Sequence, residues 1–222
     1  MPKMTTAYYA SKRAERAGGF DYSLQRRSQQ VIKMLRLADV VNGRVLDIGT
    51  ADGKMAPVLE AEFGFRLFVG LEYDREFLAR SESSDRRVFV CGDGRVLPFS
   101  DAAFDAAVAS ACVKHVTGAD QLLLEVNRVL KPGGAFVICD PTPLAIRLGV
   151  RFGRFDPRWL PNIWSLRDWR RVVEDAGFRW IRGERYMLAP WRARVAELAE
   201  AVLKPTPLSR LFLHQAALTQ KI

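Results

Sequence analysis

From residue 44 to residue 139 the chain alternates between short apolar runs and segments of helical period. The apolar runs are Arg44 to Ile48, Phe65 to Leu71, Arg87 to Cys91, Phe104 to Ala109 and Ala135 to Cys139. Helical segments are expected between them at 53–62, at Arg75 to Ser81, and where Leu122, Leu123, Val126, Val129 and Leu130 share one face before Pro132 and Gly133-Gly134. This alternation predicts a parallel sheet that is covered by helices on both faces.

The segments on either side of this core are more irregular. Residues 21–40 predict a helix with an apolar face at Leu24, Val31, Ile32 and Leu35. Three basic residues are expected off that face: Arg26, Arg27 and Lys33. The first 20 residues lack the apolar core of a secretory signal and favour an amphipathic first helix.

After Asp140 the pattern changes. Residues 141–163 are rich in proline, arginine and aromatic residues and have no clear period. Ser165 to Asp168 form a capping box that starts a helix ending at Gly177. The remaining expected elements are a strand from Phe178 to Met187, a helix from Pro190 to Lys204 and a strand from Leu211 to Gln220.

A glycine-bearing loop follows the first strand of the core, in Val45-Leu46-Asp47-Ile48-Gly49-Thr50-Ala51-Asp52-Gly53-Lys54. It marks the carboxyl end of a strand, where open α/β sheets bind ligands. A dinucleotide fingerprint requires glycines at 49, 51 and 54, but 51 is Ala and 54 is Lys. A phosphate-binding loop requires Ser or Thr after Gly53-Lys54, where Met55 stands. The loop therefore fits neither of these motifs.

Two acidic residues end the next two strands. Glu72 follows the loop by just over twenty residues, and a carboxylate there accepts hydrogen bonds from ribose hydroxyls. Asp93, in Gly92-Asp93-Gly94, is placed to accept from an adenine amino group, although Asp-Gly is also a common turn pair. The series predicts a nucleoside-binding site.

These motifs resemble those of the class I S-adenosylmethionine-dependent methyltransferases. The phrases Gly-Asp-Gly-Arg-Val-Leu-Pro-Phe at 92–99 and Glu-Val-Asn-Arg-Val-Leu-Lys-Pro-Gly-Gly at 125–134 are similar to the methyltransferase type 11 subgroup, which includes quinone-biosynthesis methyltransferases. The resemblance covers roughly residues 40–140. It implies a Rossmann-like α/β fold with a seven-stranded, mostly parallel sheet, an antiparallel last strand, helices on both faces, an N-terminal helical cap and an insertion after strand five. It also implies S-adenosylmethionine as the cofactor.

The resemblance divides the chain, taken as a single methyltransferase domain over 1–222, into four parts. They are an N-terminal helical cap (1–40), a cofactor-binding core (41–140), a substrate lid (141–164) and the C-terminal part of the sheet (165–222).

The same resemblance assigns roles by position. Asp47 supports the loop and the methionine amino group through water, and the loop residues Gly49, Thr50, Ala51 and Gly53 pass beneath the methionine part. Glu72 holds the ribose, and Tyr73 lies along the adenine. Asp93 and the Gly94 amide bind the adenine edge, and the Ser110 carbonyl accepts from the methionine ammonium. Ala51 departs from the family, which usually has glycine there.

The acceptor side is less defined by sequence. His115 follows the fourth strand and is a candidate general base, or else a structural histidine. The segment Phe152 to Trp164 either forms a lid for an anionic, partly apolar acceptor or covers the sheet edge with its aromatic residues.

Composition narrows the function classes. The net charge is +9, which attracts anionic ligands, nucleic acid or a membrane surface. No apolar run is long enough to span a bilayer, so any membrane contact is expected to be peripheral. Cys91, Cys112 and Cys139 form no metal-binding pattern and indicate a cytoplasmic protein without a metal site.

The sequence leaves three functions open. The favoured one is methyl transfer to a small-molecule acceptor that is lipid-like, a sugar or a natural product. The alternatives are an RNA methyltransferase, disfavoured because no RNA-binding module is visible, and a non-catalytic S-adenosylmethionine-binding partner subunit. Oligomeric state is not predicted.

Overall fold

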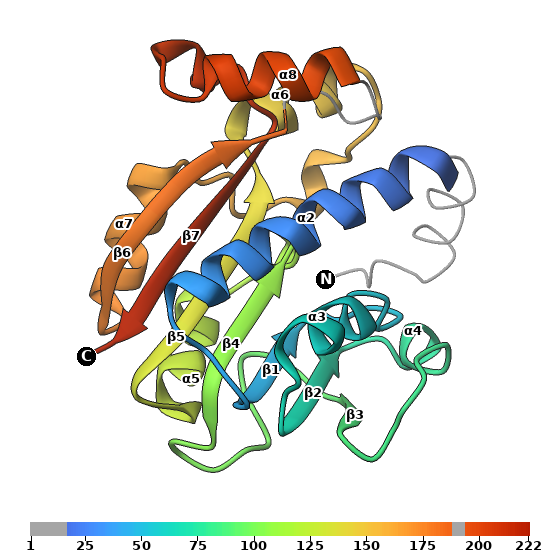
Figure 1. The fold of residues 1–222 in the computed structure, drawn as a ribbon, viewed down its shortest axis with the longest axis vertical. Coiled ribbons are helices and arrows are strands. Elements are labelled where there is room, and N and C mark those ends of the chain that lie inside the picture. The colour runs from blue at the N-terminus through green and yellow to red at the C-terminus, as the bar shows by residue number, and fades with distance from the viewer. Residues whose placement is uncertain (1–16, 188–193) are drawn as a thin grey trace.

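The computed structural model describes residues 17–187 and 194–222. A seven-stranded sheet in the order β3-β2-β1-β4-β5-β7-β6 forms its centre (Figure 1). The strands are β1 (Arg44–Ile48), β2 (Leu67–Glu72), β3 (Arg87–Cys91), β4 (Phe104–Ser110), β5 (Leu130–Pro141), β6 (Phe178–Tyr186) and β7 (His214–Lys221). The pairs among β1 to β5 are parallel, and β7 is antiparallel to both of its neighbours. The predicted fold class is confirmed, including the antiparallel last strand.

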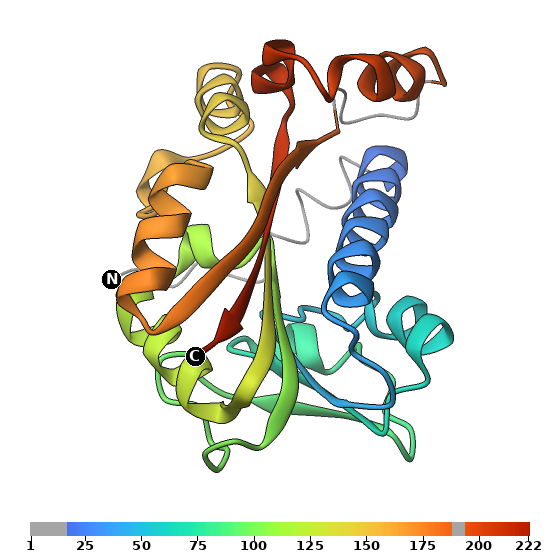
Figure 2. The ribbon, with the colours of Figure 1, turned by 60° about the vertical axis from the view of Figure 1, so that its left-hand side comes forward.

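Helices cover both faces of the sheet, as Figure 2 shows. One face carries α2 (Ala17–Leu37) and α3 (Ala56–Phe63), and its core includes Val31, Met34, Leu35 and Leu59. The other carries α5 (Ala119–Val129) and α7 (Leu166–Asp175), and its core includes Leu122, Val126, Trp169 and Val173. The predicted apolar face of α5 is confirmed for Leu122, Leu123, Val126 and Val129, whereas Leu130 begins β5; the capping box at Ser165 is also confirmed. Buried apolar side chains thus hold both layers onto the sheet.

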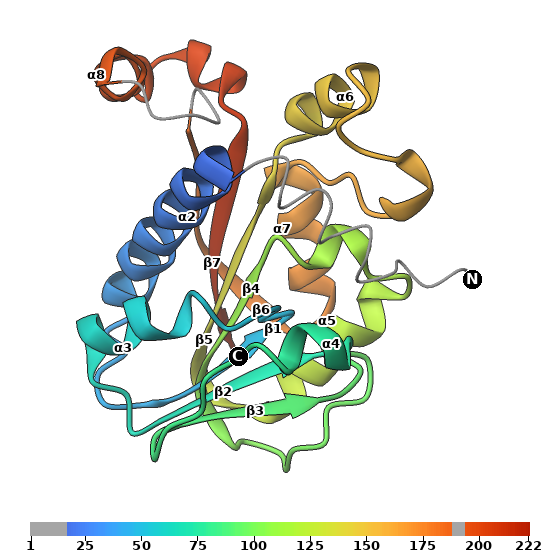
Figure 3. The ribbon, with the colours of Figure 1, turned by 90° about the vertical axis from the view of Figure 1, so that its right-hand side faces the viewer.

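The remaining elements lie around the ends of the sheet. They are α4 (Arg75–Leu78), the 3₁₀ turn η1 (Val113–His115), α6 (Pro143–Arg151), η2 (Pro157–Trp159), α8 (Arg194–Leu203) and η3 (Pro207–Leu211). Figure 3 shows α6, η3 and α8 beyond the end of the sheet where the parallel strands finish. The predictions for residues 1–16 and for the start of the helix at Pro190 lie outside the described residues.

The expectation that 141–163 lacks regular structure is wrong in its first half. Thr142 caps α6 by accepting from the Ala145 N–H, and Pro143 occupies the first turn, where its missing N–H costs nothing. Gly149 obscures the helical pattern, but a Cβ there would overlap the ring of Phe155. The glycine therefore allows the chain after α6 to fold back onto the helix.

Several boundaries differ from the sequence expectation. The strand expected from Ala135 to Cys139 is β5 and already begins at Leu130, so Pro132 and Gly133-Gly134 lie within the strand. The helix predicted at 53–62 begins at Ala56, because Gly53 is left-handed and residues before it still belong to the loop. The helix predicted at 21–40 runs Ala17–Leu37. The last strand begins at His214, because Pro207–Leu211 form a 3₁₀ turn instead.

Candidate functional site

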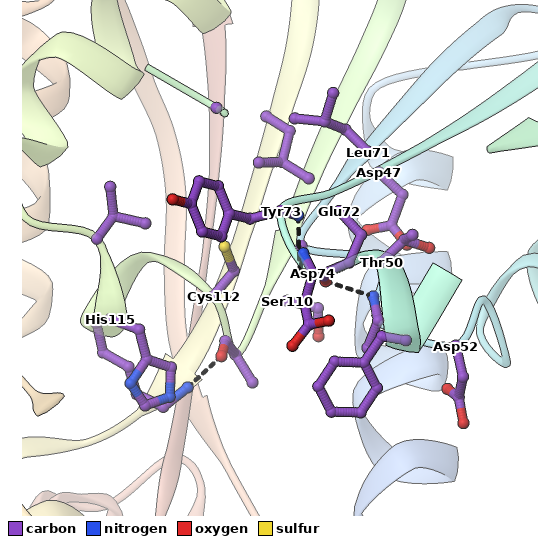
Figure 4. Close-up of a pocket in the computed structure, with 18 of the residues that line it drawn as sticks. Asp47, Thr50, Asp52, Leu71, Glu72, Tyr73, Asp74, Ser110, Cys112 and His115 are labelled. Carbon is purple, nitrogen blue, oxygen red and sulfur yellow. Dashed lines mark hydrogen bonds between the residues drawn. The ribbon is translucent and has the colours of Figure 1, made fainter. Parts of the chain in front are cut away.

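A cavity of about 1270 Å³ opens at the carboxyl ends of the parallel strands. Ligand pockets for one small molecule usually measure about 300–1,000 Å³, so this cavity has room for two ligands. All the cofactor-binding residues predicted from sequence except Gly53 line it, and His115 does too. In Figure 4, Asp47, Thr50, Glu72 and Asp74 gather on one side, and His115 lies across the cavity beyond Cys112.

The loop after β1 is shaped by left-handed backbone. Gly49 (φ +71°), Ala51 (φ +54°) and Gly53 (φ +70°) alternate with ordinary residues. The N–H groups of Gly49 and Thr50 both donate to the Leu71 carbonyl, at 2.8 and 3.1 Å. A Cβ at Gly49 would lie 2.5 Å from the Cys112 sulfur, so only glycine fits. The loop is therefore fixed against the end of β2.

Ala51 keeps the left-handed conformation despite its side chain. A left-handed residue other than glycine costs about 1–2 kcal/mol, and that cost persists only where contacts fix the backbone. Here the Ala51 N–H donates to Glu72 Oε2 at 2.9 Å. Alanine at this position thus adds local strain, and the hydrogen bond to Glu72 holds the strained backbone in place.

Glu72 joins the loop to the end of β2 (Figure 4). Besides Ala51, its carboxylate accepts from the N–H groups of Tyr73 at 2.8 Å and Asp74 at 3.1 Å. Burial raises the pKa of Glu72, and these hydrogen bonds oppose the rise. A carboxylate has about four acceptor positions, so about one is left for a ligand. Glu72 is suited to hold one hydroxyl while it fixes the loop.

The residues after β3 make a shallower part of the cavity. Asp93 is ion-paired to Arg95 at 2.6 Å, and hydrogen bonds from Arg95 lower the pKa of Asp93. A Cβ at Gly94 would lie 2.5 Å from Leu122 Cδ1, so glycine is required at this position, which also lines the cavity. Tyr73 is 58% exposed and borders the same region. A flat ring can lie here against backbone atoms.

Asp47 is buried at the end of β1, with 3% of its surface exposed. Burial raises its pKa to about 7, and the Glu72 carboxylate adds to the rise, whereas the Thr50 hydroxyl and Arg27 oppose it. The group therefore changes charge near neutral pH, and a cation bound beside it would favour the ionised form.

Arg27 was not predicted as a site residue, and its expected position off the apolar face of its helix is wrong. Arg27 is only 8% exposed, lines the cavity and donates from Nη1 to Ser110 Oγ at 3.2 Å. Its spacing is i+3 from Leu24 and i−4 from Val31, which places it within the buried stripe. An arginine inside an apolar stripe was the signal that could have revealed it.

The far side of the cavity holds further titratable groups that the sequence analysis did not assign. Lys114 Nζ lies 3.2 Å from Asp140 Oδ1, and both side chains are buried. His214, on β7, lines the cavity, and its buried Nδ1 has no hydrogen-bond partner among the described residues. Burial, with Arg27, Lys114 and Arg154 nearby, lowers the pKa of His214 to about 3. This half of the cavity is predominantly basic.

His115 lies in the wall between η1 and the segment after α6. Its Nδ1 is 2.7 Å from the Trp159 carbonyl oxygen. Because that oxygen only accepts, Nδ1 carries the hydrogen. Burial, with a smaller effect of Lys114, lowers the pKa of His115 to about 3, so the ring is neutral at pH 7. Its role as a general base stays a prediction, and a group with so low a pKa is a weak proton acceptor.

The predicted lid divides into two parts. Arg154, Phe155, Arg158 and Trp159 line the cavity. Trp164 instead packs edge-on against Trp169, with ring centroids 5.0 Å apart, and belongs to the core beside α7. Asn162 anchors the segment by donating to the carbonyls of Val113 and Val116 at 2.8 and 2.7 Å. The part that borders the cavity is therefore 154–161.

Comparisons with known proteins agree with this geometry. Residues 46–138 match the methyltransferase domain family. The chain is 33% identical over 117 residues to the ubiquinone/menaquinone biosynthesis C-methyltransferase of Desulfotalea psychrophila, covering 51% of this chain and 47% of that protein. It is 29% identical over 180 residues to a fatty-acid O-methyltransferase of Mycolicibacterium smegmatis, covering 75% of this chain and 59% of that protein.

The fold is shared with solved structures. An S-adenosylmethionine-dependent methyltransferase from Mesorhizobium loti superposes with a TM-score of 0.66 at 18% identity, covering 84% of this chain and 95% of that one. Residues 46–138 are thus a domain of the class I S-adenosylmethionine-dependent methyltransferases. Within this class the domain falls in the subgroup that is like the quinone-biosynthesis methyltransferases, and S-adenosylmethionine is its cofactor. The chain spans about half the length of the two curated relatives named above.

Proposed function

We propose that this chain transfers the methyl group of S-adenosylmethionine to a small, lipid-like acceptor that carries negative charge. A single observation supports this most: one cavity has polar strand ends and a left-handed loop on one side, and basic and aromatic side chains on the other. Its volume suits a cofactor and an acceptor together. The relatives named above are a ubiquinone/menaquinone biosynthesis C-methyltransferase and a fatty-acid O-methyltransferase, which supports the lipid-like class.

The cofactor supplies an electrophilic methyl group on a sulfonium. We assign one ribose hydroxyl to Glu72, the adenine amino group to Asp93, a ring nitrogen to the Gly94 amide and the adenine face to Tyr73. Asp47 and the Ser110 carbonyl are assigned to the methionine ammonium. The positions of these residues support the assigned roles, because each residue lies at the end of a successive strand and lines the cavity.

Arg27 is assigned to the methionine carboxylate. Its guanidinium touches the Ser110 hydroxyl, and Arg27 and Asp47 affect each other's pKa. The ammonium and carboxylate sit on one carbon atom, so the cation nearest the ammonium ligands is the carboxylate's partner. Among the described residues no carboxylate lies within ion-pair distance of Arg27. A buried guanidinium that has no carboxylate partner is strongly stabilised when an anionic ligand binds to it.

The acceptor is assigned to the side formed by 154–161, Lys114 and His214. Arg154 attracts an anion, and Phe155 and Trp159 offer apolar surface. Arg158 also lines this side, but it is ion-paired with Asp156 at 2.6 Å. His115 acts there as a positioning residue, because its Nδ1–H holds the Trp159 carbonyl. Methyl transfer depends mainly on alignment of the acceptor with the sulfonium, so fixing this wall serves the reaction directly.

Calorimetry with S-adenosylhomocysteine, NAD and 5′-methylthioadenosine tests the proposal. We expect the first to bind and NAD not to bind. Arg27→Met should weaken S-adenosylhomocysteine by about tenfold or more, the value of a charge-assisted contact. It should leave 5′-methylthioadenosine, which lacks the amino acid part, within about twofold of its original affinity.

The control is Arg66→Met, an exposed arginine at the other end of the sheet. Equal losses for both sulfur ligands would mean that Arg27 only maintains the cavity. NAD binding without a response to S-adenosylhomocysteine would overturn the proposed function. Transfer of labelled methyl into lipid extract, but not into RNA, separates the favoured function from an RNA methyltransferase, and no transfer at all would favour a non-catalytic subunit.

A further inference from the structure

Exposed apolar side chains concentrate on three elements at one end of the molecule. Figures 1 and 3 show α6, α8 and η3 beyond the carboxyl ends of the parallel strands. Six of the sixteen large apolar side chains that are exposed in the described ranges belong to these elements: Leu148, Phe152, Leu198, Val202, Leu208 and Leu211. The others are distributed over the rest of the molecule. Concentration of this kind marks an interaction surface.

The helical spacing of these side chains places them together on the exposed sides of their elements. On α6, Leu148 and the adjoining Phe152 are one turn apart and are 40% and 76% exposed. On α8, Leu198 and Val202 are one turn apart and are each 70% exposed. The opposite side of α8 is held by α2, where Tyr22 donates to Glu197 and Arg26 pairs with Glu200 at 2.7 Å. The apolar side of α8 is therefore the side left facing outward.

The charge around these side chains is mainly positive, because the acidic residues of α8, Glu197 and Glu200, are bonded to Tyr22 and Arg26 of α2. Residues 141–155 contain three arginines and no acidic residue. Residues 201–214 contain Lys204 and Arg210 and no acidic residue. Arg147 and Arg151 are one turn apart on α6, in the row next to Leu148 and Phe152. We call the six apolar side chains together with Arg147, Arg151, Lys204 and Arg210 the basic apolar surface.

We propose that the basic apolar surface docks this protein onto an anionic lipid bilayer. Aliphatic and aromatic side chains that enter the boundary of the acyl chains, with cations at the level of the headgroups, are the features of interfacial membrane binding. RNA would satisfy the cations, but it offers aliphatic side chains such as Leu148 and Leu208 no apolar partner. An acidic protein leaves the same side chains less well buried than a bilayer does.

The position of the surface relative to the cavity supports the same partner. Pro141 and Arg154 flank α6, and both line the cavity. Thr142 also joins the start of α6 to the chain after η3, through hydrogen bonds with the Phe212 and Leu213 carbonyls. The surface and the acceptor side are thus built on the same short segments. A bilayer bound here brings its headgroups to the cavity entrance.

Sedimentation with lipid vesicles tests the proposal without a methyl donor. We expect binding to vesicles of phosphatidylcholine with phosphatidylglycerol, little binding to phosphatidylcholine alone, and progressive loss as salt is raised. Phe152→Glu with Leu208→Glu should lower the partition coefficient by about tenfold or more. Arg147→Gln with Arg151→Gln should lower it by about tenfold, on anionic vesicles only.

Matched controls carry equal changes elsewhere. Val41→Glu with Leu124→Glu alters two side chains that are 73% and 52% exposed, away from the surface. Arg66→Gln with Arg86→Gln removes two exposed charges at the other end of the sheet. Both controls should bind vesicles as the wild type does. If they lose binding equally, net charge and not this surface is responsible, and the proposal fails.

Other outcomes also decide the question. Wild-type protein that ignores anionic vesicles at low salt overturns the proposal, whatever the variants do. Binding to an RNA oligonucleotide that the same variants abolish, without vesicle binding, assigns the surface to nucleic acid instead. Titration with S-adenosylhomocysteine checks that each variant is folded. Failure of the wild type in that titration refutes the proposed function but leaves the vesicle result standing.

Discussion

The two sides of the cavity are built in different ways. The side at the ends of β1, β2 and β3 is made mainly of backbone: the left-handed loop, the amides around Glu72 and the turn at Gly94. The side at β4, β5 and β7 is made of side chains that come from distant positions, such as Lys114, Arg154 and His214. A site made of backbone groups is determined by the local sequence, whereas a site made of side chains from distant positions depends on the whole fold.

The largest expected effect is a loss of turnover when the acceptor side alone is changed. Arg154→Ala with Trp159→Ala should lower turnover on the true acceptor by about 10²-fold, because a misplaced acceptor loses alignment. Affinity for S-adenosylhomocysteine should stay within about threefold. Labelled-methyl turnover and calorimetry on the same protein measure both.

Arg170→Ala on the exposed side of α7 is the control for that double variant. A folded double variant with normal turnover would place the acceptor elsewhere. Unfolding would assign these side chains to the core instead of the lid.

Glu72→Ala should act on the opposite side. The change removes the acceptor of three backbone N–H groups and a ligand for the ribose, so affinity for S-adenosylhomocysteine should fall by at least about tenfold. Calorimetry measures the loss, and Glu174→Ala on α7 should cause none. Unchanged affinity in a folded variant would place the ribose away from Glu72.

Asp47 gives a pH dependence to the same side. Its folded pKa of about 7 lies above its ordinary value, so its contribution to stability is complete below about pH 4 and is lost as pH rises through 7. If the methionine ammonium favours the ionised form, affinity for S-adenosylhomocysteine should rise about tenfold from about pH 6 to about pH 8. Titrations across that range measure it, and Asp47→Asn should flatten the profile. A profile that Asn leaves unchanged would assign the dependence to another group.

The smallest expected effect concerns Ala51. Replacement by glycine relieves the left-handed Cβ but frees the unfolded chain, for a net gain of about 1 kcal/mol or less. The affinity of Ala51→Gly for S-adenosylhomocysteine should be equal to that of the wild type or up to about threefold tighter. Calorimetry measures the affinity, and urea unfolding measures the change in stability. Ala102, also left-handed at φ +52°, is the control, since Ala102→Gly should stabilise without changing affinity. A large loss of affinity in Ala51→Gly would mean that the methyl group contacts the cofactor.

The same contrast explains how far sequence analysis could go. The loop at Gly49 and the carboxylates at 72 and 93 were recognisable because each lies within a few residues of a strand end. Arg27 was misplaced because nothing local shows that Ser110, 83 positions later, is its partner. The helix α6 was missed because Gly149 weakens its pattern, and the need for that glycine arises from Phe155 packing on it.

Helix α2 has a consequence for where this protein can be divided. The residues that match the methyltransferase family begin at 46, yet α2 covers the sheet with Val31, Met34 and Leu35, all fully buried, and brings Arg27 to the cavity. A fragment cut at residue 40 would keep every recognisable motif but would expose the apolar surface of the sheet under α2 and lose that guanidinium. The segment that matches the methyltransferase domain family is therefore smaller than the unit that folds.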